Sequence, residues 1–208
     1  MKNIKEEALV WVRLGSFAAI WIAILYLSKT GLSINWEAVK KLPEVITVYV
    51  ILSYVFTKWL WRWSLLQGWL VPFPDLQGTW QGELKSTWRD PQTGATALPV
   101  PVILVIRQNF SSISCVLYSK ESDSYSSAAQ ISQDDDSGTL RLSFNYTNRP
   151  KATIRNRSTI HDGAATLRII TNPEPALEGE YWTTRQTTGE LVLRFKSRQL
   201  LESFPAAV

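Results

Sequence analysis

Between Leu76 and Lys196, apolar and polar residues alternate along eight segments, and no helical period separates them. Period-two alternation predicts half-buried strands, and neighbouring strands joined by short turns pair antiparallel. The expected strands are residues 77–89, 97–107, 111–119, 122–132, 138–148, 157–171, 175–186 and 189–197. An open sheet of this size leaves exposed edges, which closure removes. The sequence therefore predicts an eight-stranded antiparallel up-and-down β-barrel.

Two segments fit this pattern less well. Pro99 and Pro101 in the second strand require an edge or a bulge, because proline has no backbone N–H to donate. In the sixth strand, "HDG" at 161–163 predicts either a bulge in one long strand or a turn that creates a ninth strand.

Alternation also assigns the two faces of each strand. In the first strand Trp80 and Gly78 fall on the apolar-led face, so we expect Trp80 to close the floor of the barrel and Gly78 to let the strand bend around it. Trp182 falls on the outer face, where it would serve packing or self-association. The inward positions towards the opposite end of the barrel are Tyr146, Asn148, Tyr181, Thr183 and Arg185.

Residues 1–74 have a different character. Two uncharged apolar runs extend to membrane-spanning segments at about 8–27 and 42–61 if the flanking charged side chains reach the interface. Tryptophans cluster near their ends, as in an interfacial belt. A pair of buried helices in a soluble domain is the alternative. We expect a two-helix transmembrane region (1–74), a β-barrel domain (75–200) and a C-terminal tail (201–208).

The charge is concentrated in the N-terminal part. Residues 1–74 carry eight basic and four acidic side chains, whereas residues 75–208 carry fourteen of each. A neutral barrel argues against binding of duplex nucleic acid, which requires a basic excess on the folded domain. The basic residues flanking the two spans are shared too evenly for the positive-inside rule to choose an orientation. One cysteine, Cys115, and one histidine, His161, leave little material for a disulfide or a metal site, so we expect no metal.

Antiparallel order sorts the loops between the two ends of the barrel. The acidic run 134–136 falls at the end near the membrane linker, most simply as a solvated turn. Arg149, Arg155 and Arg157 fall at the other end, beside the inward polar and aromatic positions. This mouth suits an anionic ligand with flat aromatic parts, although the arginines could also belong to an ordinary exposed loop and Arg185 could simply reach water. Neighbouring strand residues such as His161 and Asp162 point to opposite faces, so the sequence predicts neither a catalytic triad nor an enzyme.

Three stretches carry a family resemblance: "YTNRP" at 146–150, "STIHDGAATLRI" at 158–169 and "LEGEYWTTRQTTGEL" at 177–191. The chain resembles the CBASS antiphage effectors that join two transmembrane segments to a lipocalin-like β-barrel sensor. The resemblance implies that a cyclic dinucleotide, made by a partner CD-NTase on phage infection, binds inside the barrel. It further implies a multi-pass protein of the bacterial inner membrane with the barrel in the cytoplasm. Oligomerisation of the membrane segments, membrane disruption and cell death would follow binding.

The resemblance also implies roles for individual residues. Arg185 would contact phosphate, Tyr146 or Tyr181 would stack on a base, and Asn148 and Thr183 would read polar edges. His161 would line the pocket or only brace a bulge. No cofactor is expected apart from this ligand. A membrane-tethered lipocalin-like carrier of a lipid or fatty acid is the alternative function, and a two-span scaffold for protein contacts is a third.

Overall fold

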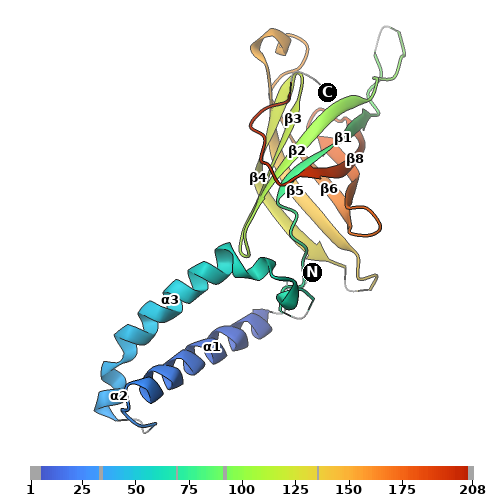
Figure 1. The fold of residues 1–208 in the computed structure, drawn as a ribbon. Coiled ribbons are helices and arrows are strands. Elements are labelled where there is room, and N and C mark those ends of the chain that lie inside the picture. The colour runs from blue at the N-terminus through green and yellow to red at the C-terminus, as the bar shows by residue number, and fades with distance from the viewer. Residues whose placement is uncertain (1–5, 33–34, 69, 91–92, 135, 206–208) are drawn as a thin grey trace. The chain divides into compact units, whose positions relative to one another are not determined.

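The computed structural model describes residues 6–205 except 33–34, 69, 91–92 and 135. The chain divides into two compact units, Lys2–Pro72 and Phe73–Val208. The first unit is helical and the second is a β-barrel (Figure 1).

The barrel contains eight antiparallel strands in the order β1 to β8, and β8 closes the sheet by pairing with β1. Their bounds are β1 Gly78–Ser86, β2 Val100–Gln108, β3 Ile113–Ser119, β4 Ser122–Gln133, β5 Leu140–Pro150, β6 His161–Ile170, β7 Ala176–Thr183 and β8 Thr188–Ser197. The predicted fold class, an up-and-down barrel of eight strands, is confirmed. We call the end at which β1 begins the floor and the opposite end the mouth.

The sixth strand is shorter than predicted. β6 begins at His161, whereas the expected strand began at residue 157. A single 3-10 turn, Ala152–Ile154, and the bonds from the N–H groups of Arg157 and Ser158 to the Ile154 carbonyl occupy the preceding segment. The β5–β6 register runs from Asn148↔His161 without a shift, so "HDG" forms neither a bulge nor an extra turn. The bulge of this wall lies in β4, between Ser126 and Ala128.

Pro101 occupies a position where its missing N–H is tolerated. It pairs with Glu83 of β1, but the β2–β3 ladder begins one residue later, at Val102. β2 is therefore locally an edge at Pro101, and the expected accommodation of this proline is confirmed. Pro99 precedes the strand.

The floor is built around Trp80, which is 2% exposed. Its indole N–H donates to the Leu76 carbonyl at 2.9 Å, and its ring meets Phe195 edge-to-face at 5.3 Å between centroids. Gly78 has a φ of +141°, and a Cβ there would lie 2.5 Å from the Ser197 carbonyl oxygen. The β1–β8 register shifts immediately beyond it, between Thr79 and Trp80. Gly78 thus allows the close approach and bend that the sequence predicts.

The outside of the barrel carries an apolar patch that alternation did not predict. Ile103, Val105 and Tyr118 are buried on the outer face of β2 and β3. The segment after β8 crosses them and packs Leu200, Leu201 and Phe204 against the patch. The part of the predicted tail that the structure describes therefore covers the wall of the barrel.

The N-terminal unit contains helices α1 (Glu6–Leu27), α2 (Trp36–Lys40) and α3 (Leu42–Lys58). Among the described residues, α1 is the one helix long and apolar enough to cross a membrane, through Val10–Leu27. α3 has 17 residues and ends at Lys58, and a 3-10 turn follows at Leu60–Arg62. The second span expected at about 42–61 is therefore helical as far as Lys58 and stays a prediction. Phe17 of α1 packs edge-to-face on Tyr49 of α3, with ring centroids 5.6 Å apart.

Candidate ligand-binding site

Two tyrosines form an aromatic layer inside the barrel near the mouth. Tyr146 of β5 and Tyr181 of β7 are both buried. Each lies across from a glycine on the next strand, Tyr146 from Gly163 and Tyr181 from Gly189. A Cβ at either glycine would stand 2.6 Å from the facing tyrosine ring. Any residue other than glycine would therefore clash with the ring at its present position. The sequence did not predict these two glycines as residues of the site.

Burial raises the pKa of Tyr146 to about 12, with a further increase from Tyr181 and a decrease from Arg185. Burial also raises the pKa of Tyr181, while a hydrogen bond with the Ser86 side chain and the charge of Arg185 oppose that increase. Both phenols are therefore neutral at physiological pH. They offer flat apolar faces and hydroxyl groups, which suits stacking and hydrogen bonding.

A polar layer lies above the tyrosines, towards the mouth. Asn148 is the next inward residue of β5 after Tyr146, and its side-chain amide donates to Ser122 Oγ at 3.0 Å and to Ser124 Oγ at 2.9 Å. Ser124 is buried. The two serines of β4 hold the amide in place, and they were not predicted, because isolated serines on a polar strand carry no distinguishing signal.

His161 stands opposite Asn148 in the β5–β6 register, on the face it shares with Gly163. Its Nδ1 lies 2.8 Å from the Thr159 carbonyl oxygen, which can only accept, so Nδ1 carries the proton. Burial lowers the pKa of His161; the Thr159 bond and Asp162 act against this, and Arg185 adds to it. The neutral ring leaves Nε2 as an acceptor. Of the two roles expected for His161, bracing a bulge is excluded because the register has no bulge there.

Arg185 lies outside the strand that was expected to carry it. β7 ends at Thr183, and the Thr183 N–H donates to the Thr187 carbonyl while the two threonine hydroxyls lie 2.6 Å apart. This tight turn interrupts the alternation, so the prediction that Arg185 faces inward along β7 is wrong. Arg185 is exposed at the mouth and donates to Ser158 Oγ at 2.9 Å. Its charge nevertheless influences both tyrosines and His161.

The other three arginines contribute unequally. Arg149 belongs to β5 and not to a loop, and it lies exposed on the face opposite to Asn148. Arg157 forms an ion pair with Glu121. Arg155 donates from Nε to the Pro150 carbonyl at 3.1 Å. Arg185 affects the pKa values of Tyr146, Tyr181 and His161, whereas Arg149 lies on the outer face and Arg157 pairs with Glu121.

The acidic turn at the floor end has its own local bonds. Asp134 accepts from the Ser137 N–H at 2.9 Å and from the Ser137 hydroxyl at 2.8 Å. These bonds lower the pKa of Asp134. Asp135 lies outside the described residues. Among the residues that the structure describes, no three His, Cys, Asp or Glu side chains are grouped to hold a metal ion.

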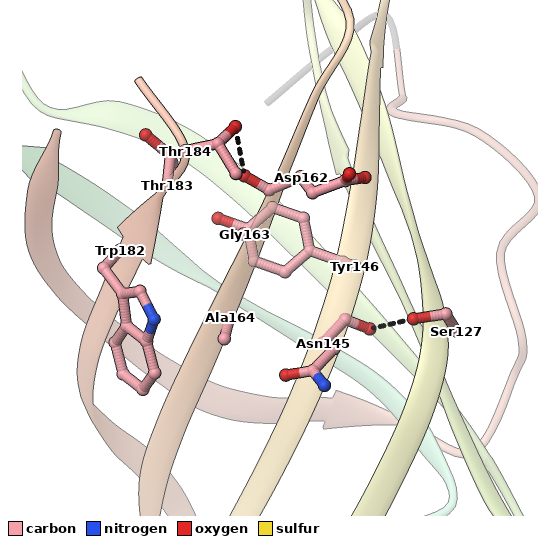
Figure 2. A pocket seen from close by; sticks show the side chains of 9 residues that line it. All are labelled: Ser127, Asn145, Tyr146, Asp162, Gly163, Ala164, Trp182, Thr183 and Thr184. Carbon is pink, nitrogen blue, oxygen red and sulfur yellow. Dashed lines mark hydrogen bonds between the residues drawn. The ribbon is translucent and has the colours of Figure 1, made fainter. Parts of the chain in front are cut away.

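A pocket of about 370 Å³ opens on the outer face of β5, β6 and β7, near the mouth. Its centre is the cross-strand row Asn145, Ala164 and Trp182, in which the small alanine leaves a depression between two larger side chains. Figure 2 shows the nine lining residues, with the ring of Tyr146 lying against Gly163. Tyr146 thus borders both the interior site and this outer pocket.

Comparison with known proteins identifies the barrel. The family described as "Cap15, cyclic dinucleotide receptor domain" matches residues 71–195. The chain belongs to the Cap15 family.

Two curated relatives carry the name "CD-NTase-associated protein 15". The protein from Staphylococcus schleiferi is 28% identical over 181 residues, which cover 86% of this chain and 92% of the relative. The protein from Escherichia albertii is 29% identical over 149 residues, which cover 70% and 72% of the two chains. The resemblance to CBASS effectors with a β-barrel sensor is therefore confirmed. The Cap15 domain is described as a receptor, in line with a site built for binding.

Proposed function

We propose that the mouth of the barrel binds a cyclic dinucleotide. Binding would convert the N-terminal unit from an inactive membrane anchor into an assembly that disrupts the membrane. The ligand would be made by the CD-NTase of the same CBASS system. The proposed contacts are base stacking on Tyr146 and Tyr181, polar recognition by Asn148, His161 and Thr183, and phosphate binding by Arg185.

The observation that supports this proposal most strongly is the pairing of each buried tyrosine with a cross-strand glycine beneath an exposed arginine. The glycines make room for the rings, and an aromatic side chain is the group on which a base stacks. Arg185 can exchange its neutral partner Ser158 for a phosphate oxygen, because a guanidinium binds an anion more strongly than it binds a hydroxyl. Arg155 stands in the same loop as Ser158 and would add charge after a loop movement.

The helical unit supports a membrane location. Large apolar side chains of α1 and α3 are exposed along the helices, including Leu14, Ile22, Ile46 and Val50. Exposed apolar surface of this extent requires lipid or a protein partner. We propose that α1 and α3 insert together as a multi-pass hairpin in the inner membrane, with the barrel on the cytoplasmic side. Ligand-driven oligomerisation would then concentrate these hairpins and break the bilayer.

A lipid carrier fits the interior less well. Leu142, Leu167, Leu177 and Leu193 pack against one another inside the barrel, all without measurable exposure. An acyl chain would have to displace this packed core. The polar layer around Asn148 also lacks the apolar portal through which a fatty acid would enter.

The test uses the full-length protein in detergent and measures its thermal unfolding with a panel of cyclic dinucleotides and fatty acids. A shift of several degrees with one cyclic dinucleotide supports the receptor. Leakage of a dye from proteoliposomes on addition of that same compound tests membrane disruption. Stabilisation by fatty acids alone would favour the carrier, and no stabilisation by any compound would refute both.

A further inference from the structure

The described residues of the β1–β2 connection, 87–90 and 93–99, form an arm that projects beyond the mouth of the barrel (Figure 1). Apart from residues 91–92, which are not described, it is a built hairpin. Arg89 and Thr96 form a β-bridge, and the Asp90 N–H donates to the Ala95 carbonyl at 2.9 Å. The arm carries Leu98, which is 83% exposed, and Trp88, which is 45% exposed. Ordered apolar side chains presented in this way are typical of a contact surface.

The outer pocket has the complementary form. Ala164 and Gly163 form a small-residue base, and Trp182, 48% exposed, forms one wall. Ser127, at the bulge of β4, lines another side of the pocket. An apolar depression with a polar rim is the arrangement that receives an anchoring side chain in protein interfaces.

The arm and the pocket lie on opposite walls of the barrel. In the closed order β1 to β8, the β5–β6 pair lies directly across the barrel from the β1–β2 pair, because β3 and β4 separate them on one side and β7 and β8 on the other. The arm leaves from β1 and β2, whereas the pocket faces outward from β5, β6 and β7. An arm therefore meets a pocket most directly when the two belong to different copies of the chain.

The charges beside the two surfaces match. Arg89 is exposed on the arm next to Trp88, and the exposed Asp162 lies at the rim of the pocket. The Asp162 carboxylate accepts from Thr147 Oγ1 at 2.7 Å, which orients it along the outer wall. Opposite charges flanking an apolar contact fix its register.

We propose that the arm of one copy docks in the outer pocket of a second copy, with Leu98 against Ala164 and Trp182 and with Arg89 facing Asp162. The two surfaces differ, so the contact is heterologous, and each docked copy still offers a free arm or a free pocket. Association can therefore continue beyond a dimer. This contact supplies a structural basis for the oligomerisation in the proposed function and depends on that function only for its biological role.

Both halves of the contact adjoin the ligand site. Tyr146 lines the pocket from the inside, and its ring lies against Gly163. Tyr181 faces Gly189 of β8, and Gly189 pairs on its other side with Ser86, the last residue of β1 before the arm. A ligand that moves the two tyrosines would thus act on the pocket and on the root of the arm together.

Cysteine cross-linking of the full-length protein in detergent tests the contact, in a Cys115→Ala background and with or without the cyclic dinucleotide panel. A chain carrying both Leu98→Cys and Ala164→Cys should form a ladder of dimers, trimers and longer species with a short bismaleimide. Either cysteine alone should give no ladder, and an equal mixture of the two single-cysteine chains should stop at the dimer. Ser114→Cys, exposed on the outer face of β3, replaces Ala164→Cys as the matched control.

Charge reversal provides a second test in the same double-cysteine chain. Arg89→Asp or Asp162→Arg alone should reduce the ladder severalfold, and the two together should restore it. Equal ladders with the Ser114 control, dimers from Leu98→Cys alone, or no ladder under any condition would overturn the docking contact. Thermal stabilisation is measured on the same samples. Stabilisation without a ladder would leave the receptor intact and reject the contact, whereas a ladder without stabilisation would retain the contact and reject the ligand.

Discussion

Replacement of Arg185 by alanine tests the ligand site where sequence and structure differ most. The exposed Arg185 donates a hydrogen bond to the neutral Ser158 side chain, so its loss should cost less than about 1 kcal/mol of stability. In the proposed complex it would form charge-assisted bonds to phosphate. Such bonds contribute about 1.5–3 kcal/mol, so the variant should bind roughly 10- to 150-fold more weakly.

The expected thermal shift follows from these magnitudes. A ligand present at 100 times its dissociation constant stabilises the folded state by about 2.7 kcal/mol. If Arg185→Ala weakens binding by about 30-fold, the same ligand concentration stabilises the variant by only about 0.9 kcal/mol. The shift in melting temperature should therefore fall to about one third of the wild-type value, while the melting temperature without ligand changes little.

Two arginine variants make the measurement specific. Arg149→Ala removes an exposed arginine of the outer face of β5 and should bind as wild type. Arg185→Lys keeps the charge but loses the planar donor pair, so it should fall between wild type and alanine. Calorimetric titration measures the three affinities directly. Wild-type affinity in Arg185→Ala, or an equal loss in Arg149→Ala, would refute phosphate recognition by Arg185.

Three further predictions concern the barrel itself. Trp80→Ala should lower the free energy of unfolding by about 3–5 kcal/mol in urea titrations, because the indole is buried and hydrogen-bonded. Trp182→Ala, at an exposed position, should change it little. Equal effects of the two substitutions would contradict the role of Trp80 in the floor. Gly82→Ala should prevent folding or sharply lower the melting temperature, because its Cβ would overlap with the backbone carbonyl of Val192. Gly138→Asn, in an open turn at φ +66°, should be tolerated. A normal melting temperature for Gly82→Ala would be the opposing result. Burial raises the pKa of the Cys115 thiol from 9.0 to about 12. As the pH rises above 9, the thiol therefore loses its proton in the unfolded chain but keeps it in the folded chain. The free energy of unfolding should then fall by about 1.4 kcal/mol per pH unit. Urea titrations from pH 8 to pH 11 should show a smaller decline in Cys115→Ala, and an unchanged decline would contradict this assignment.

The barrel was predictable because its wall is regular. Alternation specifies the face of nearly every strand residue, and one buried side fixes the register. The predictions failed where local hydrogen bonds replaced the ladder. The Ile154 carbonyl captures two N–H groups before β6, and the Thr183–Thr187 bonds end β7 two residues before Arg185. The alternation of apolar and polar residues assigns faces within a strand, but it does not indicate the residue at which the strand ends and a turn begins.

The inward aromatic and polar positions were also predictable, whereas their supporting residues were not. Tyr146, Asn148 and Tyr181 follow from parity, because β5 and β7 run without a bulge as far as these residues. Ser122 and Ser124 depend on the β4–β5 register, which includes a bulge at Ser127. A register between two strands is a long-range property, and the inward positions at the mouth end of β4 are serines, which give it no apolar marker. The inward Ala129 and Ile131 lie beyond the bulge.

Gly163 links the two surfaces on which the proposals depend. On its inner side it accommodates the ring of Tyr146, and on its outer side it borders the pocket beside Ala164 and Trp182. No side chain separates the two at this point, so the wall there is one backbone thick. A base that displaces Tyr146 must therefore press on the strand that forms the pocket, since a packed wall transmits a shift instead of absorbing it. In the proposed complex, a ligand at the mouth of the barrel would in this way alter the surface that we propose to face another copy.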